Sequence, residues 1–180
     1  MTPRTIGSSE RLRTERLSLI PFGPEHVDDL HALWTDPDVR RYLWDDEVIS
    51  REVASSVVKA SLASFRKYGF GFWVLLPSGG DDIVGFAGLR PFGVDGEIEL
   101  LYGLEPNSWG RGLATEAARA VLRHGFSAVG LTTIFAGADP PNIASLQVMD
   151  RLGFGDEHRR EIDGVESIYR SLDSFSLDRV

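Results

Sequence analysis

The 180-residue sequence contains no cysteine, and this absence removes several kinds of chemistry at once. Disulfides, cysteine-ligated zinc, iron–sulfur clusters and thiol nucleophiles all require that residue, so the chain can have none of them. Histidine is scarce as well, and the four histidines show no i,i+3 or i,i+4 pairing and join no carboxylate cluster in a recognisable metal pattern. We therefore expect no metal site.

Basic residues are fewer than acidic ones. Nineteen basic residues against 27 acidic ones give a formal net charge of −8 with no basic block, which disfavours nucleic acid and anionic membranes as partners. The longest apolar runs, such as residues 72–76, are far shorter than the roughly 20 residues that cross a bilayer. The N-terminal segment lacks the apolar region of a secretory signal, so we expect a cytoplasmic protein.

The hydrophobic fraction of 42% is enough for one globular domain. Residues 1–14 are polar and aperiodic, which predicts a flexible leader before a single domain over 15–180. The periodicity then favours a mixed α/β (α+β) fold with an antiparallel meander in its first half and a strand-helix-strand unit in its second. Strands are expected at 16–20, 70–76, 83–89, 97–104, 131–136, 154–160 and 165–172, and helices at 24–34, 37–42, 50–68, 113–129 and 142–152, the last two closed by Gly130 and Gly153.

A glycine-bearing turn between the strand at 97–104 and the next helix is the most informative segment. Gly110 and Gly112 let the backbone come close to a ligand, and the first N–H groups of the helix lack internal partners. The turn could hold a phosphate or pyrophosphate, with added charge from Arg111 and a hydroxyl from Thr115. For an isolated pair of glycines, a tight strand-to-helix connection in which glycine serves geometry alone is the simpler interpretation.

Two familiar phosphate motifs do not fit this turn. A P-loop needs a lysine after its last glycine, but the only lysines are Lys59 and Lys67. A dinucleotide fingerprint would place glycine or alanine at position 115, where Thr115 stands, and an acidic residue at the end of the next strand, where 132–135 read Thr-Thr-Ile-Phe. The nucleotide-fold oxidoreductase interpretation is therefore weak.

The residues 109–117, Trp-Gly-Arg-Gly-Leu-Ala-Thr-Glu-Ala, resemble the acetyl-coenzyme A turn of the GNAT N-acetyltransferase superfamily, in its RimJ/RimL-like branch. Three further motifs look like that branch in the same order: 14–19 (Thr-Glu-Arg-Leu-Ser-Leu), 34–39 (Trp-Thr-Asp-Pro-Asp-Val), and 142–145 (Asn-Ile-Ala-Ser) through 151–154 (Arg-Leu-Gly-Phe). The resemblance covers about residues 14 to 172. It implies a GNAT-like fold with splayed central strands and acetyl-CoA as acetyl donor.

The resemblance also implies how acetyl-CoA is held. The pantetheine arm would lie beside Tyr102, Gly103 and Leu104, where this strand and the strand at 131–136 splay apart and Leu104 leaves part of its backbone unpaired. Asn142 is a further cofactor contact, or only a helix N-cap. The backbone N–H groups expected at the pyrophosphate are those of Gly110, Arg111, Gly112, Leu113, Ala114 and Thr115.

Acetyl transfer to an amine needs a base for the ammonium proton and a partner for the departing thiolate. Glu99 matches a glutamate of the branch and is the candidate base, although Glu97 and Glu99 could both simply line a solvated sheet face. Many superfamily members carry a tyrosine at the position of Met149, which has no proton to give. In the RimL-like branch a serine acts as acid or orients the sulfur, and Ser145 matches it; the alternative is an ordinary helix serine.

These observations predict an acetyl-CoA-dependent N-acetyltransferase in which a primary amine attacks directly in a ternary complex. The acceptor would be a protein N-terminal amine or a small-molecule amine, and the protein a monomer or homodimer. By the resemblance, the acidic segment 44–47 lies on the acceptor side of the cleft, although a solvated charge run is the simpler interpretation. The alternative function is a catalytically inactive acyl-CoA-binding sensor or assembly module.

Overall fold

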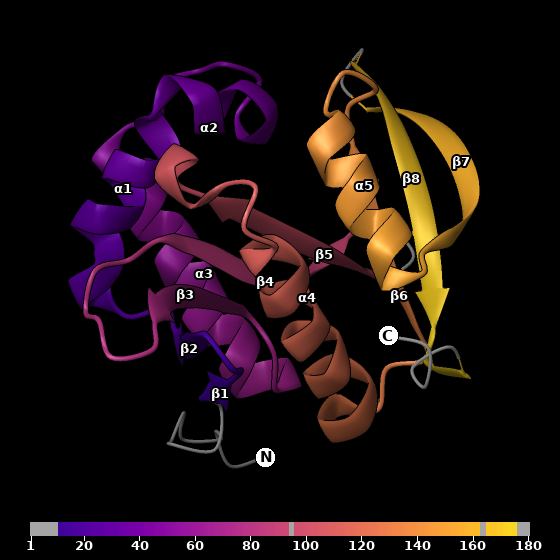
Figure 1. Ribbon diagram of the computed structural model, residues 1–180, viewed down its shortest axis with the longest axis horizontal. Helices are drawn as coiled ribbons and strands as arrows, with labels where there is room; N and C mark the ends of the chain where they lie inside the picture. Colours follow the sequence, from indigo (N-terminus) through magenta and orange to yellow (C-terminus); the bar gives the residue numbers. More distant parts are fainter. Residues whose placement is uncertain (1–10, 94–95, 163–164, 176–180) are drawn as a thin grey trace.

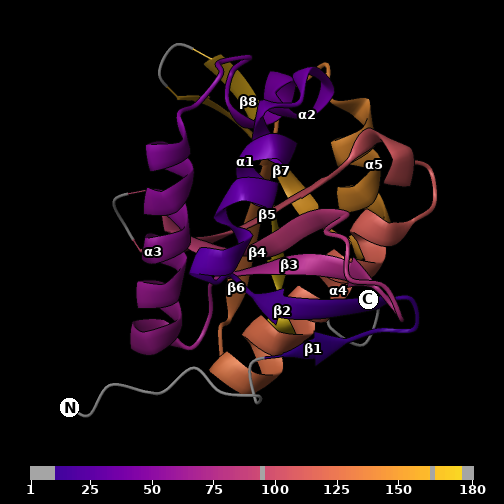
Figure 2. The same ribbon diagram turned by 90° about the vertical axis from the view of Figure 1, so that its left-hand side faces the viewer.

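Residues 11–93, 96–162 and 165–175, which the computed structural model describes, form one eight-stranded sheet with helices on both faces (Figures 1 and 2). The strand order is β1-β2-β3-β4-β5-β6-β8-β7, and neighbours are antiparallel except β5 and β6, which run parallel. The strands are β1 (Leu12–Arg13), β2 (Leu17–Pro21), β3 (Phe72–Pro77), β4 (Gly85–Phe92), β5 (Glu97–Leu104), β6 (Thr133–Ala138), β7 (Gly155–Ile162) and β8 (Val165–Asp173). The helices are α1 (Val27–Thr35), α2 (Pro37–Leu43), α3 (Arg51–Tyr68), α4 (Leu113–Arg123) and α5 (Ile143–Leu152), with short turns η2 (Pro24–His26), η3 (Pro106–Ser108) and η4 (His124–Val129). The predicted mixed α/β fold class is confirmed.

The N-terminal boundary differs from the expected one. Residues 1–10 of the predicted leader lie outside the described residues, but Leu12 and Arg13 pair with Leu19 and Ser18 of β2. Residues 12 and 13 are therefore part of the sheet.

Capping residues determine where the helices begin and end. The Ser50 side chain accepts a hydrogen bond from the Val53 N–H at the start of α3, and Gly69 ends that helix in the left-handed conformation at φ 82°. Gly153 ends α5 in the same way at φ 78°. Gly130 does so after η4, a π-helical continuation of α4. Both predicted glycine stops are confirmed.

The sheet carries a separate hydrophobic core on each face, because successive strand side chains point to opposite sides. On β3, Val74 packs into a cluster with Phe22, Leu30 and Trp34 under α1, α2 and α3. Trp73 and Leu75 pack into the other cluster, with Ala117, Val121 and Leu122 of α4 and Met149 and Leu152 of α5. Figure 2 shows α1 and α3 in front of the sheet and α4 behind it.

The central strands separate part-way along their length. β5 pairs with β6 at Glu99 opposite Phe135 and at Leu100 opposite Ala136. Residues 101–104 of β5 keep their partners on β4 but have none in the β6 register. The splay expected between these strands is therefore present, and it opens toward the glycine-bearing turn that follows β5.

Candidate active site

A cleft of about 1820 Å³ opens where β5 and β6 separate. It is bordered by the end of β5, the first turns of α4 and α5, and residues of α2 and β8. Of the predicted site residues, Arg111 alone does not line it. Those that do are Glu99, Tyr102, Gly103, Leu104, Gly110, Gly112, Leu113, Ala114, Thr115, Asn142 and Ser145.

The glycine-bearing turn is built for a close backbone approach. Gly110 and Gly112 adopt φ 71° and 75°, in the left-handed region that glycine reaches without steric cost. Gly112 precedes α4, so the free N–H groups of that helix begin at the cleft. The Thr115 side chain lies there as well, only 8% exposed, and its hydroxyl has no hydrogen-bond partner in the described part of the chain. A buried donor without a partner at a helix N-terminus fits an anionic ligand.

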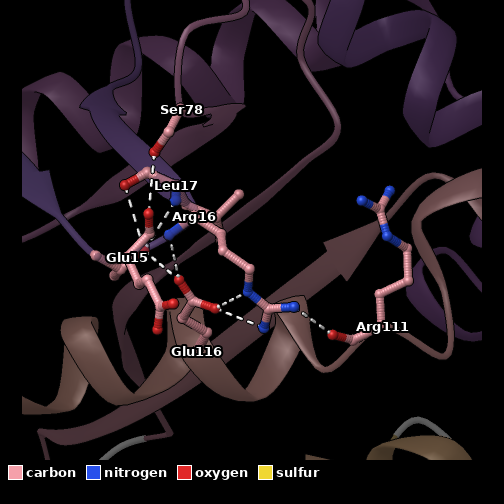
Figure 3. A network of polar contacts seen from close by, with 7 residues as sticks. Glu15, Arg16, Leu17, Ser78, Arg111 and Glu116 are labelled. Carbon is pink, nitrogen blue, oxygen red and sulfur yellow. Dashed lines mark hydrogen bonds and ion pairs between the residues drawn. The ribbon is translucent and has the colours of Figure 1, made fainter.

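An ion pair with the N-terminal strand holds this turn in place (Figure 3). The Glu116 carboxylate accepts hydrogen bonds from the Thr14 hydroxyl at 2.5 Å, the Arg16 backbone N–H at 2.9 Å and the Arg16 Nε at 2.7 Å. Arg16 Nη1 also donates to the Arg111 carbonyl at 2.8 Å, while the Arg111 side chain extends away from Glu116. Burial of Glu116 opposes ionisation, but these hydrogen bonds together hold its pKa below the ordinary value. The motif at 14–19 and the motif at 109–117, which lie far apart in the sequence, are therefore in direct contact.

Tyr102 and Ser145 meet across the opening between the strands. The Tyr102 hydroxyl lies 2.9 Å from Ser145 Oγ and 3.2 Å from the Ser145 carbonyl oxygen. Asn142 caps α5, since its side-chain oxygen accepts from the Ser145 N–H at 3.1 Å. Burial raises the pKa of Tyr102 to about 12, although the Ser145 hydrogen bond opposes the shift. The side chain of Met149 is fully buried in the core and does not line the cleft.

Glu99 is buried among charged and aromatic side chains, so the interpretation of a solvated strand face is wrong for this residue. It is 3% exposed, and its Oε2 accepts from Arg90 Nε at 2.7 Å, with Arg90 Nη2 also at 2.7 Å. Burial and the neighbouring Glu99 carboxylate raise the pKa of Tyr169. On the same strand, Glu97 accepts two hydrogen bonds from Arg160 at 2.6 and 2.9 Å.

Sequence reasoning missed the arginine partners and Tyr169. The signal for Arg90 was available in the hairpin register, because Phe92 pairs with Glu97 and counting back two residues on β4 places Arg90 opposite Glu99. Tyr169 and Arg160 come from β8 and β7, and the sequence carries no local signal that brings them to β5.

Trp109 also has a contact that the sequence does not reveal. Its indole Nε1 donates to the Leu104 carbonyl at 2.8 Å, and the residue remains 49% exposed at the edge of the cleft. The Leu104 carbonyl is therefore paired, and the expectation that part of the Leu104 backbone is unpaired stays a prediction for its N–H.

The opposite wall of the cleft includes Asp38, Tyr42 and Asp45 from α2 and the loop after it. Asp45 and Asp46 both adopt positive φ, 51° and 63°, and Arg40 pairs with Asp46 at 2.9 Å. Among residues 44–47, expected on the acceptor side, only Asp45 lines the cleft.

A family model described as an acetyltransferase (GNAT) domain matches residues 16–155. The chain belongs to the GNAT acetyltransferase family. Within this family, N-acetyltransferase p20 from Bacillus licheniformis, itself uncharacterised, is 29% identical over 153 residues, which cover 82% of this chain and 84% of the relative. FsC-acetyl coenzyme A-N(2)-transacetylase from Aspergillus fumigatus is 30% identical over 159 residues, which cover 83% of this chain and 66% of the relative.

Solved structures of the family share the fold. The ribosomal L7/L12 alpha-N-protein acetyltransferase RimL, solved in complex with coenzyme A, superposes with a TM-score of 0.75 at 17% identity, covering 91% of this chain and 97% of that one. The family and its N-acetyltransferase relatives make this chain an acetyl-CoA-dependent acetyltransferase. The cleft, the two left-handed glycines and the unpartnered Thr115 hydroxyl fit a long ligand with phosphate groups.

No group of three or more metal-ligating side chains comes together in the parts of the chain that the structure describes. Nor is any helix within those residues long and apolar enough to span a bilayer.

Proposed function

We propose that this acetyltransferase, as a member of the RimJ/RimL-like branch, transfers an acetyl group from acetyl-CoA to a primary amine by direct attack in a ternary complex. The observation that carries the proposal is the buried, unpartnered hydroxyl of Thr115 beside two left-handed glycines at the start of α4. Such a group is costly to leave unsatisfied, and phosphate oxygens would satisfy it together with the free N–H groups of the helix. The same cleft reaches Glu99 and Ser145.

The chain's own residues would hold the donor along the cleft. The backbone N–H groups of residues 110–115 would bind the pyrophosphate, and Asn142 would lie beside the coenzyme while capping α5. Residues 102–104, which lack β6 partners, would receive the pantetheine arm as an added strand. Bound acetyl-CoA supplies a thioester whose carbonyl carbon can accept the nitrogen lone pair.

Glu99 is the proposed base. Glu99 lines the cleft, and the Arg90 guanidinium holds its carboxylate in place at 2.7 Å. It would take the ammonium proton of the acceptor, directly or through water, because only the neutral amine has a lone pair to attack with. Ser145 is the proposed partner of the departing sulfur.

The acceptor class follows from the chemistry of the site and the names of relatives. RimL is named for acetylating a protein N-terminus, and the Aspergillus fumigatus relative for N(2)-transacetylation, so both a protein N-terminal amine and a small-molecule amine are candidate acceptors. Both acceptors occur in the cytoplasm, where we place the activity. The acidic side chains of Asp38 and Asp45 on the opposite wall suit a cationic amine.

A non-catalytic acyl-CoA-binding module is the second candidate. It is favoured by the burial of Met149 in the core, which leaves the position of the superfamily tyrosine without a proton donor facing the cleft.

Calorimetric titration with acetyl-CoA, beside NADH and ATP, tests the proposal, followed by a panel of peptides with free N-termini and of small amines. Selective acetyl-CoA binding with turnover on either acceptor class supports the proposal. The set of compounds that is acetylated, peptides or small amines, identifies the acceptor class. Binding without turnover on the panel supports the module. Affinity for NADH alone would select an oxidoreductase and overturn both.

A further inference from the structure

The hydroxyl groups of Tyr102 and Ser145 form a pair inside the cleft, and the proposed function assigns a role to the serine alone. Tyr102 lies on β5, Ser145 lies in the first turn of α5, and their oxygens are 2.9 Å apart. Both residues line the cleft where the strands separate. The pair is therefore placed beside the proposed path of the pantetheine arm.

The pair has two arrangements of its protons. In one, Ser145 Oγ donates to the phenol, and the phenol donates to the Ser145 carbonyl 3.2 Å away. In the other, the phenol donates to Ser145 Oγ, which frees the serine proton to point into the cleft. Rotation of two hydroxyl groups interconverts them. Negative charge in the cleft favours the second arrangement, because the serine proton is then free to donate to that charge.

We propose that Tyr102 is a positioning residue for Ser145, and that its phenol donates to Ser145 Oγ so that the serine hydroxyl donates to the thiolate of coenzyme A. This inference rests on the proposed function. Glu99 takes one proton from the ammonium before attack, and the amine lone pair then forms the new C–N bond. The C–S electron pair leaves with sulfur, and the second proton that nitrogen must lose passes to water. The thiolate takes its proton from water after release.

The acidities decide between hydrogen bonding and full proton transfer. Tyr102 has a pKa of about 12, whereas an ordinary thiol has a pKa of about 8.5, so the phenol is a far weaker acid than the thiol. The phenol therefore stays protonated and acts as a hydrogen-bond donor throughout. The pair stabilises sulfur as an anion and does not protonate it, which also explains how the site can work with Met149 at the superfamily tyrosine position.

The pKa of the bound coenzyme A thiol tests the proposal without an acceptor or turnover. Titration by the ultraviolet absorbance of the thiolate should place it about one to two units below that of free coenzyme A, because one hydrogen bond to a charged group is worth that much. Tyr102→Phe and Ser145→Ala should each raise the pKa of the bound thiol most of the way back to that of free coenzyme A. Tyr68→Phe is the matched control, since Tyr68 is 42% exposed, stacks on Phe70 and lies outside the cleft.

Unfolding of the free protein supplies an independent readout. If the hydroxyls are partners, the summed losses in unfolding free energy of the two single variants should exceed the loss in the double variant, because each single change removes the 2.9 Å partner of a part-buried hydroxyl.

The outcomes separate this inference from the proposed function. A thiol pKa that is unchanged by Tyr102→Phe, or by Ser145→Ala, overturns the positioning role while coenzyme A binding stands. Failure of coenzyme A to bind the wild-type protein overturns the proposed function and this inference with it.

Discussion

Arg16 and Glu116 form an ion pair at 2.6 Å although 100 residues of chain separate them. The pair joins the start of β2 to the first turn of α4, and Arg16 also holds the Arg111 carbonyl within the glycine-bearing turn. The N-terminal segment therefore shapes the proposed pyrophosphate site. Figure 3 shows this arrangement.

The Arg16 clamp consists of the contacts from Arg16 to Glu116 and to the Arg111 carbonyl. Its loss should weaken acetyl-CoA binding more than it lowers the stability of the fold. Arg16→Lys keeps the charge but cannot span both Glu116 and the Arg111 carbonyl. Because the Arg16 side chain is 47% exposed, we expect a stability cost of about 1 kcal/mol or less and a several-fold loss of affinity. Calorimetry and urea unfolding measure the two effects. Arg51→Lys, in the exposed pair with Asp28, is the control, and an affinity equal to wild type in Arg16→Lys would refute the clamp.

Alanine at either turn glycine should cost both stability and affinity. Gly110 and Gly112 have positive φ, so a side chain there adds strain of about 1–2 kcal/mol whatever the space around it. Gly79→Ala is the matched control, because Gly79 has φ 84°, has no atom within 4 Å of its added Cβ, and lies outside the cleft. It should lose similar stability and keep its acetyl-CoA affinity. Equal affinity losses at all three positions would show that the turn has no special role.

Thr115→Val should change stability and affinity in opposite directions. Valine has nearly the same shape and removes an unpartnered buried hydroxyl, so the free protein should unfold at the same or a higher urea concentration. The affinity for acetyl-CoA should fall, by roughly tenfold for one lost hydrogen bond to a charged group. If affinity is retained, the hydroxyl does not bind the ligand.

Glu99→Gln should lower kcat on an identified acceptor by on the order of 10²-fold, the lower end expected for loss of a general base. The loss should diminish at high pH, where more of the amine is already neutral. Glu97→Gln is a control from the same strand, since Glu97 pairs with Arg160 and does not line the cleft. Wild-type turnover by Glu99→Gln would remove Glu99 from the mechanism.

The free energy of unfolding should decrease when the pH is lowered below about 4.5, the ordinary pKa of a glutamate. Hydrogen bonds from Arg160 lower the pKa of Glu97, and burial of Glu116 is outweighed by its bonds from Thr14 and Arg16, so both pKa values are depressed in the folded state. Their contribution is present above the ordinary value and is lost as pH falls through the depressed folded values. Urea unfolding at a series of acidic pH values measures it. Glu97→Gln and Glu116→Gln should each flatten the profile, and a profile unchanged in both variants would contradict this origin.

Much of the architecture was predictable because its signals are local. The bounds of β5 coincide with the predicted strand at 97–104, and Gly130 and Gly153 end their helices as expected. Strand periodicity and a glycine at a helix end both depend only on residues close by in the chain. The motif at 109–117 likewise indicated the family, which the match over 16–155 confirms. The roles of Glu99 and Ser145 remain predictions.

The amino-acid sequence by itself determined the order of the strands and α-helices from β2 onward, the family and which residues could carry chemistry, because periodicity, caps and short motifs act within a few residues of chain. Only the tertiary structure decided which of these residues meet. The pairs Arg16–Glu116 and Tyr102–Ser145 each depend on how two segments distant in sequence pack on one another. A hydrogen bond needs its two atoms within about 3 Å, and that distance is set by the packing of strands and helices around both cores, which no local pattern encodes.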